Sequence, residues 1–326
     1  MTLNSASHDF EISGFVETVV IVRDPEPHLT SWCDVGGWVV RHQGAVDSRL
    51  LGLWGLPNAS GEEWLVGHPD VDTGYVRLVK LHDAGTQRDI RANDQCWDSG
   101  GIFDLNVRVI DVEAKAAQLQ NLQWHGAAPP VAWKFGPMSV KEWLVRGPDN
   151  VRLALIERVE PPLQGFDHLR EFSHAFNSSQ IVRNMEASLE FYCGILGFTM
   201  AISVDLERLP AGPNVFGLPV ELAAQTGLSI RILHPKGLND GSIELVTLNG
   251  ASGLDHSGMA GPPHFGMAVL RFPVKGVQAL ADHLTGKGVR LLATIQNAEL
   301  APYGNVRMLG VPAPDGVLLE FFETLG

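Results

Sequence analysis

The feature that most constrains this chain is an internal duplication. The stretch that begins at Ile21 (IVRDPEPHL) aligns without a gap with the stretch that begins at Ile181 (IVRNMEASL). Two later pairs of segments match in the same order, residues 74–81 with 241–248 and residues 148–154 with 314–320. Collinear repeats of this kind indicate two copies of one unit. We therefore predict two domains, residues 12–158 and 172–326, and a chain of 326 residues is long enough to bury two cores.

Each copy contains two smaller units of the form strand, helix and several strands. These four modules span roughly residues 15–82, 101–157, 174–250 and 263–323. Apolar residues at helical spacing predict the helices of the second and fourth modules at 112–122 and 277–284. The paired prolines in residues 159–166 suit neither a helix nor a sheet interior, so this segment is the predicted linker between the copies.

Composition narrows the class of protein. The formal net charge of −13 disfavours binding to nucleic acid, because such a surface repels phosphate. The three cysteines form no CxxC pair, which is typical of a reducing compartment. No apolar run is long enough to span a bilayer, and the first residues lack the pattern of a signal peptide. We expect a cytoplasmic protein without a membrane partner.

Two motifs in the second copy carry a family resemblance. Residues 180–198 (QIVRNMEASLEFYCGILGF) resemble the opening motif of the vicinal-oxygen-chelate superfamily, which includes glyoxalases, bleomycin-resistance proteins and extradiol dioxygenases. Residues 314–321 (PDGVLLEF) resemble its closing motif, a turn into a strand that carries a ligand glutamate. The resemblance covers nearly all of the second half, and it covers the first half mainly through the repeat.

The resemblance implies an α+β fold of two tandem domains. Each domain would consist of two βαβββ modules that form a curved mixed sheet around a cleft. We expect neighbouring modules to pair, the first with the second and the third with the fourth. Some relatives pair the first module with the fourth instead, and the sequence leaves this alternative open.

In this family the ligands come from the first and last strands of each module. The corresponding residues of the second half are Asn177, Glu244, His264 and Glu320. Those of the first half are Glu17, Arg77, Asp104 and Ala154. The assignment of His264 requires a few extra residues before the helix, and without them Met267 takes the position. The resemblance implies a divalent cation (Zn, Ni, Mn, Fe or Co) in the second half, or no metal if the cleft only binds a ligand.

Such a site implies a glyoxalase-like, metal-dependent lyase or isomerase with a small oxygenated carbonyl compound as its substrate. The cation would stabilise an enediolate or enolate while Glu244 or Glu320 moves the proton. An extradiol-type ring-cleaving dioxygenase is one alternative, although Asn177 leaves its two-His-one-carboxylate triad incomplete. A metal-free, drug-sequestering binding protein is another. The sequence decides neither among these activities nor whether the chain forms a homodimer.

The first half reads as a degenerate site. A guanidinium offers no lone pair, so Arg77 cannot be a metal ligand, and Ala154 removes the closing carboxylate. Only Glu17 and Asp104 would remain as ligands. We expect Arg77 to form an internal ion pair with Glu17 or Asp104, and binding of an anionic ligand by these residues is the alternative.

Overall fold

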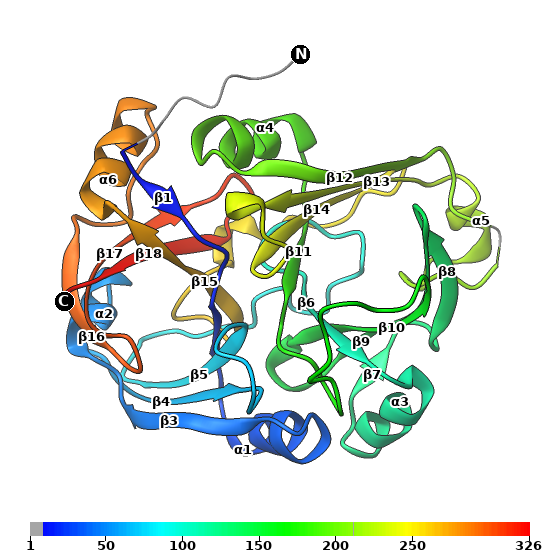
Figure 1. The fold of residues 1–326 in the computed structure, drawn as a ribbon, viewed down its shortest axis with the longest axis horizontal. Helices are drawn as coiled ribbons and strands as arrows, with labels where there is room; N and C mark the ends of the chain where they lie inside the picture. Colours follow the sequence, from blue (N-terminus) through cyan, green and yellow to red (C-terminus); the bar gives the residue numbers. More distant parts are fainter. Residues whose placement is uncertain (1–8, 211) are drawn as a thin grey trace.

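The computed structural model describes residues 9–210 and 212–326, and its strands form two nine-stranded mixed sheets. We call them sheet I and sheet II. Sheet I lies on the left of Figure 1 in blue, orange and red, and sheet II on the right in green and yellow. The predicted α+β architecture of two curved sheets built from four modules is confirmed.

Sheet I combines the first and fourth modules. Its strands are β2 (Glu17–Ile21), β3 (Val39–Ala45), β4 (Ser60–Gly67), β5 (Tyr75–His82), β15 (Gly266–Lys275), β16 (Gln296–Leu300), β17 (Gly304–Pro312) and β18 (Leu318–Thr324). The order is β16-β17-β18-β15-β2-β5-β4-β3, and β1 (Glu11–Ile12) pairs with β15. Within each module the first and last strands are parallel, and the two modules join through the antiparallel pair of β2 and β15.

Sheet II combines the second and third modules in the same way. Its strands are β6 (Asp104–Val109), β7 (His125–Gly126), β8 (Val131–Phe135), β9 (Met138–Arg146), β10 (Arg152–Glu160), β11 (Asn177–Ile181), β12 (Thr199–Leu206), β13 (Gly227–His234) and β14 (Ser242–Asn249). The order is β12-β13-β14-β11-β6-β10-β9-β7, and β8 pairs with β9. The modules join through the antiparallel pair of β6 and β11.

The expected pairing of neighbouring modules is therefore wrong. Each predicted domain, 12–158 and 172–326, supplies one module to each sheet, so neither half of the chain closes a sheet of its own. The alternative pairing of the first module with the fourth is the one that the structure adopts. Each sheet consequently presents a concave face whose residues come from both halves of the sequence.

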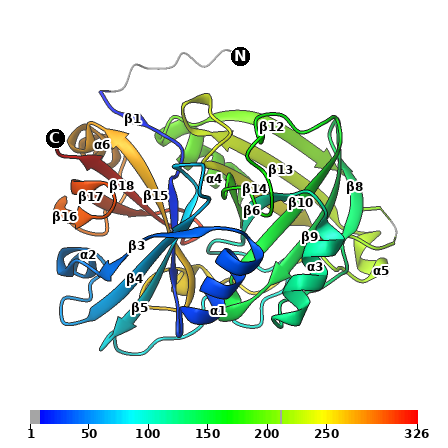
Figure 2. The same ribbon diagram turned by 60° about the horizontal axis from the view of Figure 1, so that its bottom comes forward.

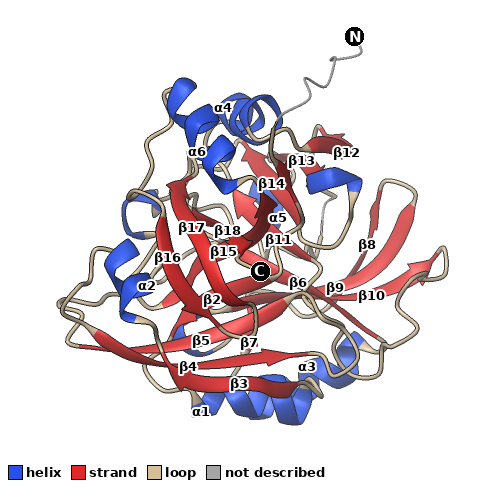
Figure 3. Cartoon of the chain, turned by 60° about the vertical axis from the view of Figure 1, so that its left-hand side comes forward, coloured by secondary structure: helices blue, strands red, loops and turns tan. Residues whose placement is uncertain are grey.

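The helices pack on both faces of the sheets (Figure 3). They are α1 (Glu26–Leu29), α2 (Ser48–Leu53), α3 (Val112–Asn121), α4 (Met185–Leu189), α5 (Val220–Ala223) and α6 (Val277–Gly286), and α1 and α4 continue as π-helical turns at Thr30–Val35 and Glu190–Ile195. Equivalent carboxylates cap α3 and α6: Glu157 accepts the backbone N–H of Val112, and Glu323 accepts that of Val277. The predicted helices of the second and fourth modules are confirmed.

Two equivalent glycines fix how the first and third modules approach each other. Gly74 and Gly241, which the repeat aligns, both have positive φ, at 66° and 74°. A Cβ on Gly74 would lie 2.3 Å from the carbonyl oxygen of Ala175, and one on Gly241 would lie 2.2 Å from the backbone nitrogen of Phe15. Only glycine combines this conformation with so close a backbone contact.

Three buried apolar clusters divide the interior. The largest draws on all four modules, including Trp32, Leu119, Phe198 and Phe272, and holds the helix-covered faces of the sheets together. The second covers the concave face of sheet I, and the third covers that of sheet II. The two concave faces are thus separate environments. Among the described residues no helix is long and apolar enough to cross a membrane.

Candidate functional site

The structure does not bring the predicted metal ligands of the second half together. Glu244 lies on β14 of sheet II, whereas Glu320 lies on β18 of sheet I. Asn177, on β11, shares a sheet with Glu244 only. His264 precedes β15, and its Nδ1 accepts the backbone N–H of Arg88 at 3.2 Å. The expected convergence of His264, Glu244 and Glu320 in one hollow is therefore wrong.

The position assigned to His264 or Met267 belongs to Arg271. In register, Arg271 lies beside Glu17 on β2 and beside Glu320 on β18. The equivalent residue of the second module is Asn106, which lies beside Ala154. Each of these residues stands six positions before the start of its helix, at Val277 or Val112. This helix-to-strand spacing was the sequence signal that could have identified Arg271.

The concave face of sheet I holds a closed network of buried charges. The Arg77 guanidinium donates to both carboxylate oxygens of Glu17 at 2.8 and 2.9 Å, and to Glu63 at 2.7 Å. Arg271 donates to Glu17 at 2.7 Å and to Glu320 at 2.6 Å. Glu17, Arg77, Arg271 and Glu320 are all 0% exposed. The predicted ion pair of Arg77 with Glu17 is confirmed, and Asp104 takes no part because it lies in sheet II.

Aromatic donors complete this network. Trp54 Nε1 donates to Glu320 at 2.5 Å, and the Tyr303 hydroxyl donates to Glu17 at 3.2 Å. Burial alone would raise the pKa of Glu17, but the charges of Arg77 and Arg271 outweigh it and lower the pKa to about 2. Glu320 is thus engaged as an ion-pair partner, which leaves it unsuited to the role of free base.

Apolar side chains of α2 fill the rest of this concave face. Leu50, Leu51 and Leu53 are buried against the strands of sheet I, together with Trp54. The N-cap residue Asp47 also accepts the backbone N–H of Glu299 on β16, which ties α2 to the sheet edge (Figure 2). Sheet I therefore has its ligand positions neutralised by guanidinium groups and its hollow occupied by the protein itself.

Sheet II, in contrast, retains a cavity of about 150 Å³ on its concave face. Strands β6, β9, β10, β11 and β14 contribute alternate residues to its wall, as period-two alternation requires. The polar side chains of the wall are Asp104, Asn106, Arg108, Glu142, Arg158, Asn177, Ser179, Asn239 and Glu244. The remainder is apolar or aromatic, including Trp133 and Phe176. This composition, mostly apolar with a few convergent polar groups, is typical of a small-molecule site.

Three carboxyl groups meet in this cavity: Asp104, Glu142 and Glu244. Burial raises the pKa of Asp104 to about 6 and that of Glu142 to about 7. Burial, together with the charges of Asp104 and Glu142, raises the pKa of Glu244 to about 8. Near neutral pH the cavity therefore contains both an ionised and a protonated carboxyl group.

The three carboxyl groups also differ in their hydrogen bonds. Glu142 accepts Trp133 Nε1 at 2.8 Å. Asp104 has one buried carboxylate oxygen, Oδ1, without a hydrogen-bond partner. Across the part of the chain that the structure describes, no hydrogen bond engages the Glu244 carboxyl, which is half-buried because it faces the cavity. Glu244 is therefore free to interact with a ligand, whereas Glu142 is held by the wall.

The amides on the central strands bind each other. Asn106 Nδ2 donates to the side-chain oxygen Oδ1 of Asn177 at 2.6 Å, and Asn177 Nδ2 donates to the Ser242 hydroxyl at 2.9 Å. Asn177 is 1% exposed, so it acts as a bridge between β6, β11 and β14. Sequence reasoning found Asn177, Glu244 and Asp104 here. It missed Glu142, which stands out only as an acidic residue at an inward position of β9.

The donor set fits a divalent cation poorly. The strand register gives the position assigned to Asp104 to Asn106, so that assignment is wrong. The four ligand positions of sheet II are then Asn106, Ala154, Asn177 and Glu244, and one carboxylate remains among them. Among the described residues, no three carboxylate, imidazole or thiolate ligand atoms in this cavity lie within 4.8 Å of one another. The acidic group that does meet this limit, Asp111, Glu113 and Glu157, surrounds the start of α3, where Lys141 pairs with it. We therefore derive no catalytic step through a metal.

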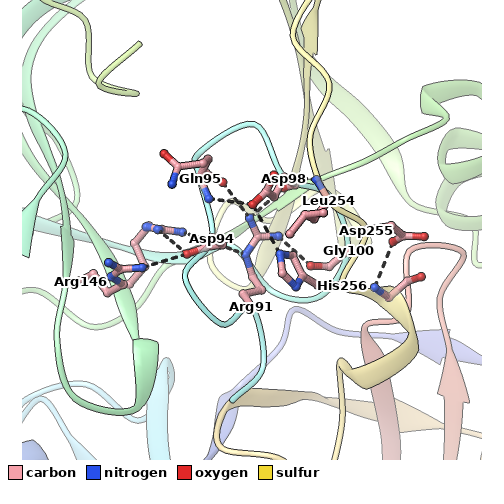
Figure 4. Close-up of polar contacts among 11 residues, drawn as sticks. Arg91, Asp94, Gln95, Asp98, Gly100, Arg146, Leu254, Asp255 and His256 are labelled. Atoms are coloured by element: carbon pink, nitrogen blue, oxygen red, sulfur yellow. Dashed lines mark hydrogen bonds and ion pairs between the residues drawn. The ribbon is translucent and has the colours of Figure 1, made fainter. Parts of the chain in front are cut away.

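A polar network anchors the wall of the cavity from behind. Asp94 lies between the guanidinium groups of Arg91 and Arg152, at 2.6 and 2.9 Å, and Arg146 approaches it at 3.3 Å (Figure 4). Arg152 in turn lies over the ring of Phe103, 4.4 Å from its centroid. Because Phe103 directly precedes Asp104 and also lines the cavity, this network holds the strand that presents Asp104.

Residues 165–321 match the family model described as the Glyoxalase/Bleomycin resistance protein/Dioxygenase superfamily. Glyoxalase I from Zea mays superposes with a TM-score of 0.62 at 14% identity, covering 97% of this chain and 93% of that chain. A putative dioxygenase from Bacillus subtilis superposes with a TM-score of 0.57 at 10% identity, covering 97% and 86%. No curated protein matches the chain significantly in sequence.

At such low identities these likenesses establish the fold and leave the activity open. The family match covers both modules of the second half, and the structural matches extend the same architecture over the first. The same family is indicated by the opening and closing motifs of the second half. Its fold agrees with the four βαβββ modules and the two curved sheets. Residues 165–321 therefore belong to the vicinal-oxygen-chelate superfamily, and the first half of the chain shares its fold.

Proposed function

We propose that the sheet II cavity is the functional site of a glyoxalase-like lyase or isomerase that acts on a small oxygenated carbonyl compound. The observation that supports this most strongly is the convergence of Asp104, Glu142 and Glu244 on one cavity from three different strands. Engineered cavities of about 150 Å³ take up benzene, so a ligand of that size fits. On the concave face of sheet I, side chains of α2 take this place instead.

The chemistry proposed is proton transfer at the carbon beside a carbonyl group. An ionised carboxylate removes the proton, the electron pair moves into the carbonyl group, and the enolate or enediolate oxygen accepts a hydrogen bond or a proton from a protonated carboxyl. Asp104 is suited to accept the proton because its pKa of about 6 keeps it ionised at neutral pH. Glu244 is suited to donate because its pKa of about 8 keeps it protonated.

Return of the proton to a different carbon or oxygen gives an isomerase, and departure of a neighbouring group gives a lyase. The apolar wall formed by Ile230, Ile232 and Val246 excludes water from this exchange. Ring cleavage by an extradiol mechanism has less support, because no histidine is among the described residues that line the cavity.

The proposal is tested by hydrogen exchange at carbon. Small ketones, hydroxyketones and 2-oxo acids are incubated with the protein in D₂O, and loss of the proton signal beside the carbonyl is followed by NMR. We expect exchange above the buffer rate with at least one compound, and a loss of about 10²–10⁴-fold in Glu244→Gln.

The matched control is Glu186→Gln, which changes an exposed glutamate of α4 and should leave the rate unchanged. Binding of these compounds without any exchange would contradict catalysis and would favour the metal-free binding protein. Exchange that survives in Glu244→Gln and in Asp104→Asn would show that other groups move the proton.

A further inference from the structure

Two half-buried arginines in the sheet II cavity form no side-chain hydrogen bond or ion pair with the residues that the structure describes. Arg77, Arg91, Arg152 and Arg271 are buried, and each donates at least two side-chain hydrogen bonds. Arg108 and Arg158 line the cavity, and each has a buried Nε without a partner. Within residues 9–210 and 212–326, neither guanidinium forms an ion pair.

The fold places these two guanidinium groups together. Arg108 lies on β6 and Arg158 on the adjacent β10, two positions beyond the residue that pairs with Arg108. Both side chains extend from the same face as Asp104 and Glu142. The Arg108 guanidinium lies over the ring of Phe176, 4.5 Å from its centroid, which fixes its direction.

The cavity acids do not satisfy these arginines. No carboxylate oxygen of Glu142 or Glu244 lies within 4.0 Å of either guanidinium, although both acids are close enough to influence the pKa of Arg108. Burial and the neighbouring charge of Arg158 lower the pKa of Arg108 to about 10. It stays protonated at neutral pH, whereas Glu244 and part of Glu142 do not carry a charge. The arginine side of the cavity is therefore short of negative charge.

A buried guanidinium nitrogen without an acceptor costs free energy that an added anion recovers. We infer that Arg108 and Arg158 bind a carboxylate of the ligand, so that the substrate class is a small monocarboxylic acid whose carbonyl carbon faces Glu244. The part of this inference that places the reacting carbonyl carbon beside Glu244 rests on the proposed function. The part that places the ligand carboxylate on the arginines does not depend on it. The strand register orders the two ends, because Asp104 and Glu244 flank Ser179 in one row, whereas Arg108 lies in another row with Ile156 and Glu142.

Charge and size select a carboxylate over a phosphate. The cavity of about 150 Å³ takes a ligand of about benzene size, so a 2-oxo acid of a few carbons fits. A planar carboxylate matches the fork of a guanidinium, and one negative charge suffices beside two arginines and an ionised Asp104. A phosphate dianion would bring its second charge toward the acidic side of the cavity.

The test measures binding of matched acid and amide probes by calorimetry. The probes are 2-oxobutyrate with 2-oxobutyramide and benzoate with benzamide, which differ in charge and hardly in size. We expect a carboxylate to bind in the millimolar range or tighter and to bind about 10- to 100-fold better than its amide. Arg158→Gln and Arg108→Gln should each remove most of that preference, and Arg158→Lys should retain part of it.

Two controls keep the result specific. Arg290→Gln changes an exposed arginine outside the cavity and should alter nothing. Amide binding that is unchanged in the arginine variants shows that the cavity is intact. Equal binding of acid and amide, an equal loss of both in Arg158→Gln, no carboxylate binding in the millimolar range, or tighter binding of inorganic phosphate through the same arginines would each overturn the inference.

The failures of the two proposals are distinguishable. Glu244→Gln should abolish proton exchange while leaving the preference for the acid in place, because it removes neither guanidinium. Carboxylates that bind through Arg108 and Arg158 without any exchange would refute the proposed reaction alone. Exchange with 2-oxo acids that is unaffected by Arg108→Gln and Arg158→Gln would refute the carboxylate assignment alone.

Discussion

The two sheets are built from the same module and differ in how they treat their charges. In sheet I, Glu17, Arg77, Arg271 and Glu320 form ion pairs with one another, and α2 fills the remaining hollow. In sheet II, the equivalent positions are Asn177, Glu244, Asn106 and Ala154, and a cavity remains. A buried site thus becomes structural when its own chain pairs each charged group with an opposite charge. It stays available to a ligand when partners are missing.

The largest expected effect separates a paired arginine from an unpaired one. Arg271→Met should lower the free energy of unfolding by about 3–5 kcal/mol, because Glu17 and Glu320 lose a buried partner. The matched change in sheet II, Arg108→Met, should stay within about 1 kcal/mol of the wild type, since no protein acceptor is left unpaired. Urea unfolding followed by circular dichroism measures both, and equal losses would erase the distinction between the sheets.

The second effect is an opposite response to pH. Acids with a raised folded-state pKa lose stability as pH rises, so Asp104, Glu142 and Glu244 should make the protein less stable between about pH 5 and pH 8. Glu17 has a lowered pKa, so its contribution is present above about pH 4.5 and is lost as pH falls toward 2.

Urea unfolding at a series of pH values tests this directly. One unit of pKa shift corresponds to about 1.4 kcal/mol, so the decline toward pH 8 should exceed that value in the wild type. Glu244→Gln should reduce the loss of unfolding free energy between pH 5 and pH 8. It should leave the loss of stability below about pH 4.5 unchanged. A wild-type free energy of unfolding that rises steadily from pH 5 to pH 8 would contradict the assigned environments of the cavity acids.

A smaller difference concerns metal content. The donor sets of both sheets predict less than one bound Zn, Ni, Mn, Fe or Co ion per chain in untagged protein. Glu320→Ala should change this content no more than Arg77→Ala does, because both residues belong to the sheet I network. Elemental analysis after dialysis measures it. A stoichiometric ion that is lost in Glu244→Gln would restore the metal-dependent version of the proposed reaction.

The smallest expected effect is that of His264→Gln. His264 lies outside both concave networks and binds the backbone N–H of Arg88. We expect a change in the free energy of unfolding within about 0.5 kcal/mol, as for an ordinary surface substitution. Carbonyl proton exchange should remain within twofold of the wild type, and a larger loss would return His264 to the site.

The repeat predicted the modules well because βαβββ units depend on local patterns. The helices at 112–122 and 277–284 and the motif strands at Glu244 and Glu320 all lie where the sequence indicated. Pairing of modules could not be predicted in this way. The decisive contact joins Glu17 to Arg271, 254 positions apart, and no local pattern records which sheet edge a module meets.

The errors at the site have two sources, the pairing of modules and the choice of residue within a strand. Glu244 and Glu320 were assigned to one hollow because they lie in the same half of the sequence, and the structure places them in different sheets. His264 was chosen by motif likeness, although the six-residue spacing to the helix points to Arg271. Glu142 and the unpaired Arg108 become apparent only once the concave face of sheet II is assembled.

The most direct test of this account is a crystal structure of the protein soaked with 2-oxobutyrate. The account predicts density in the sheet II cavity, with the carboxylate on Arg108 and Arg158 and the keto group beside Glu244, while the sheet I network is unchanged. Ligand or ion density between Glu17 and Glu320, with a guanidinium displaced, would contradict it.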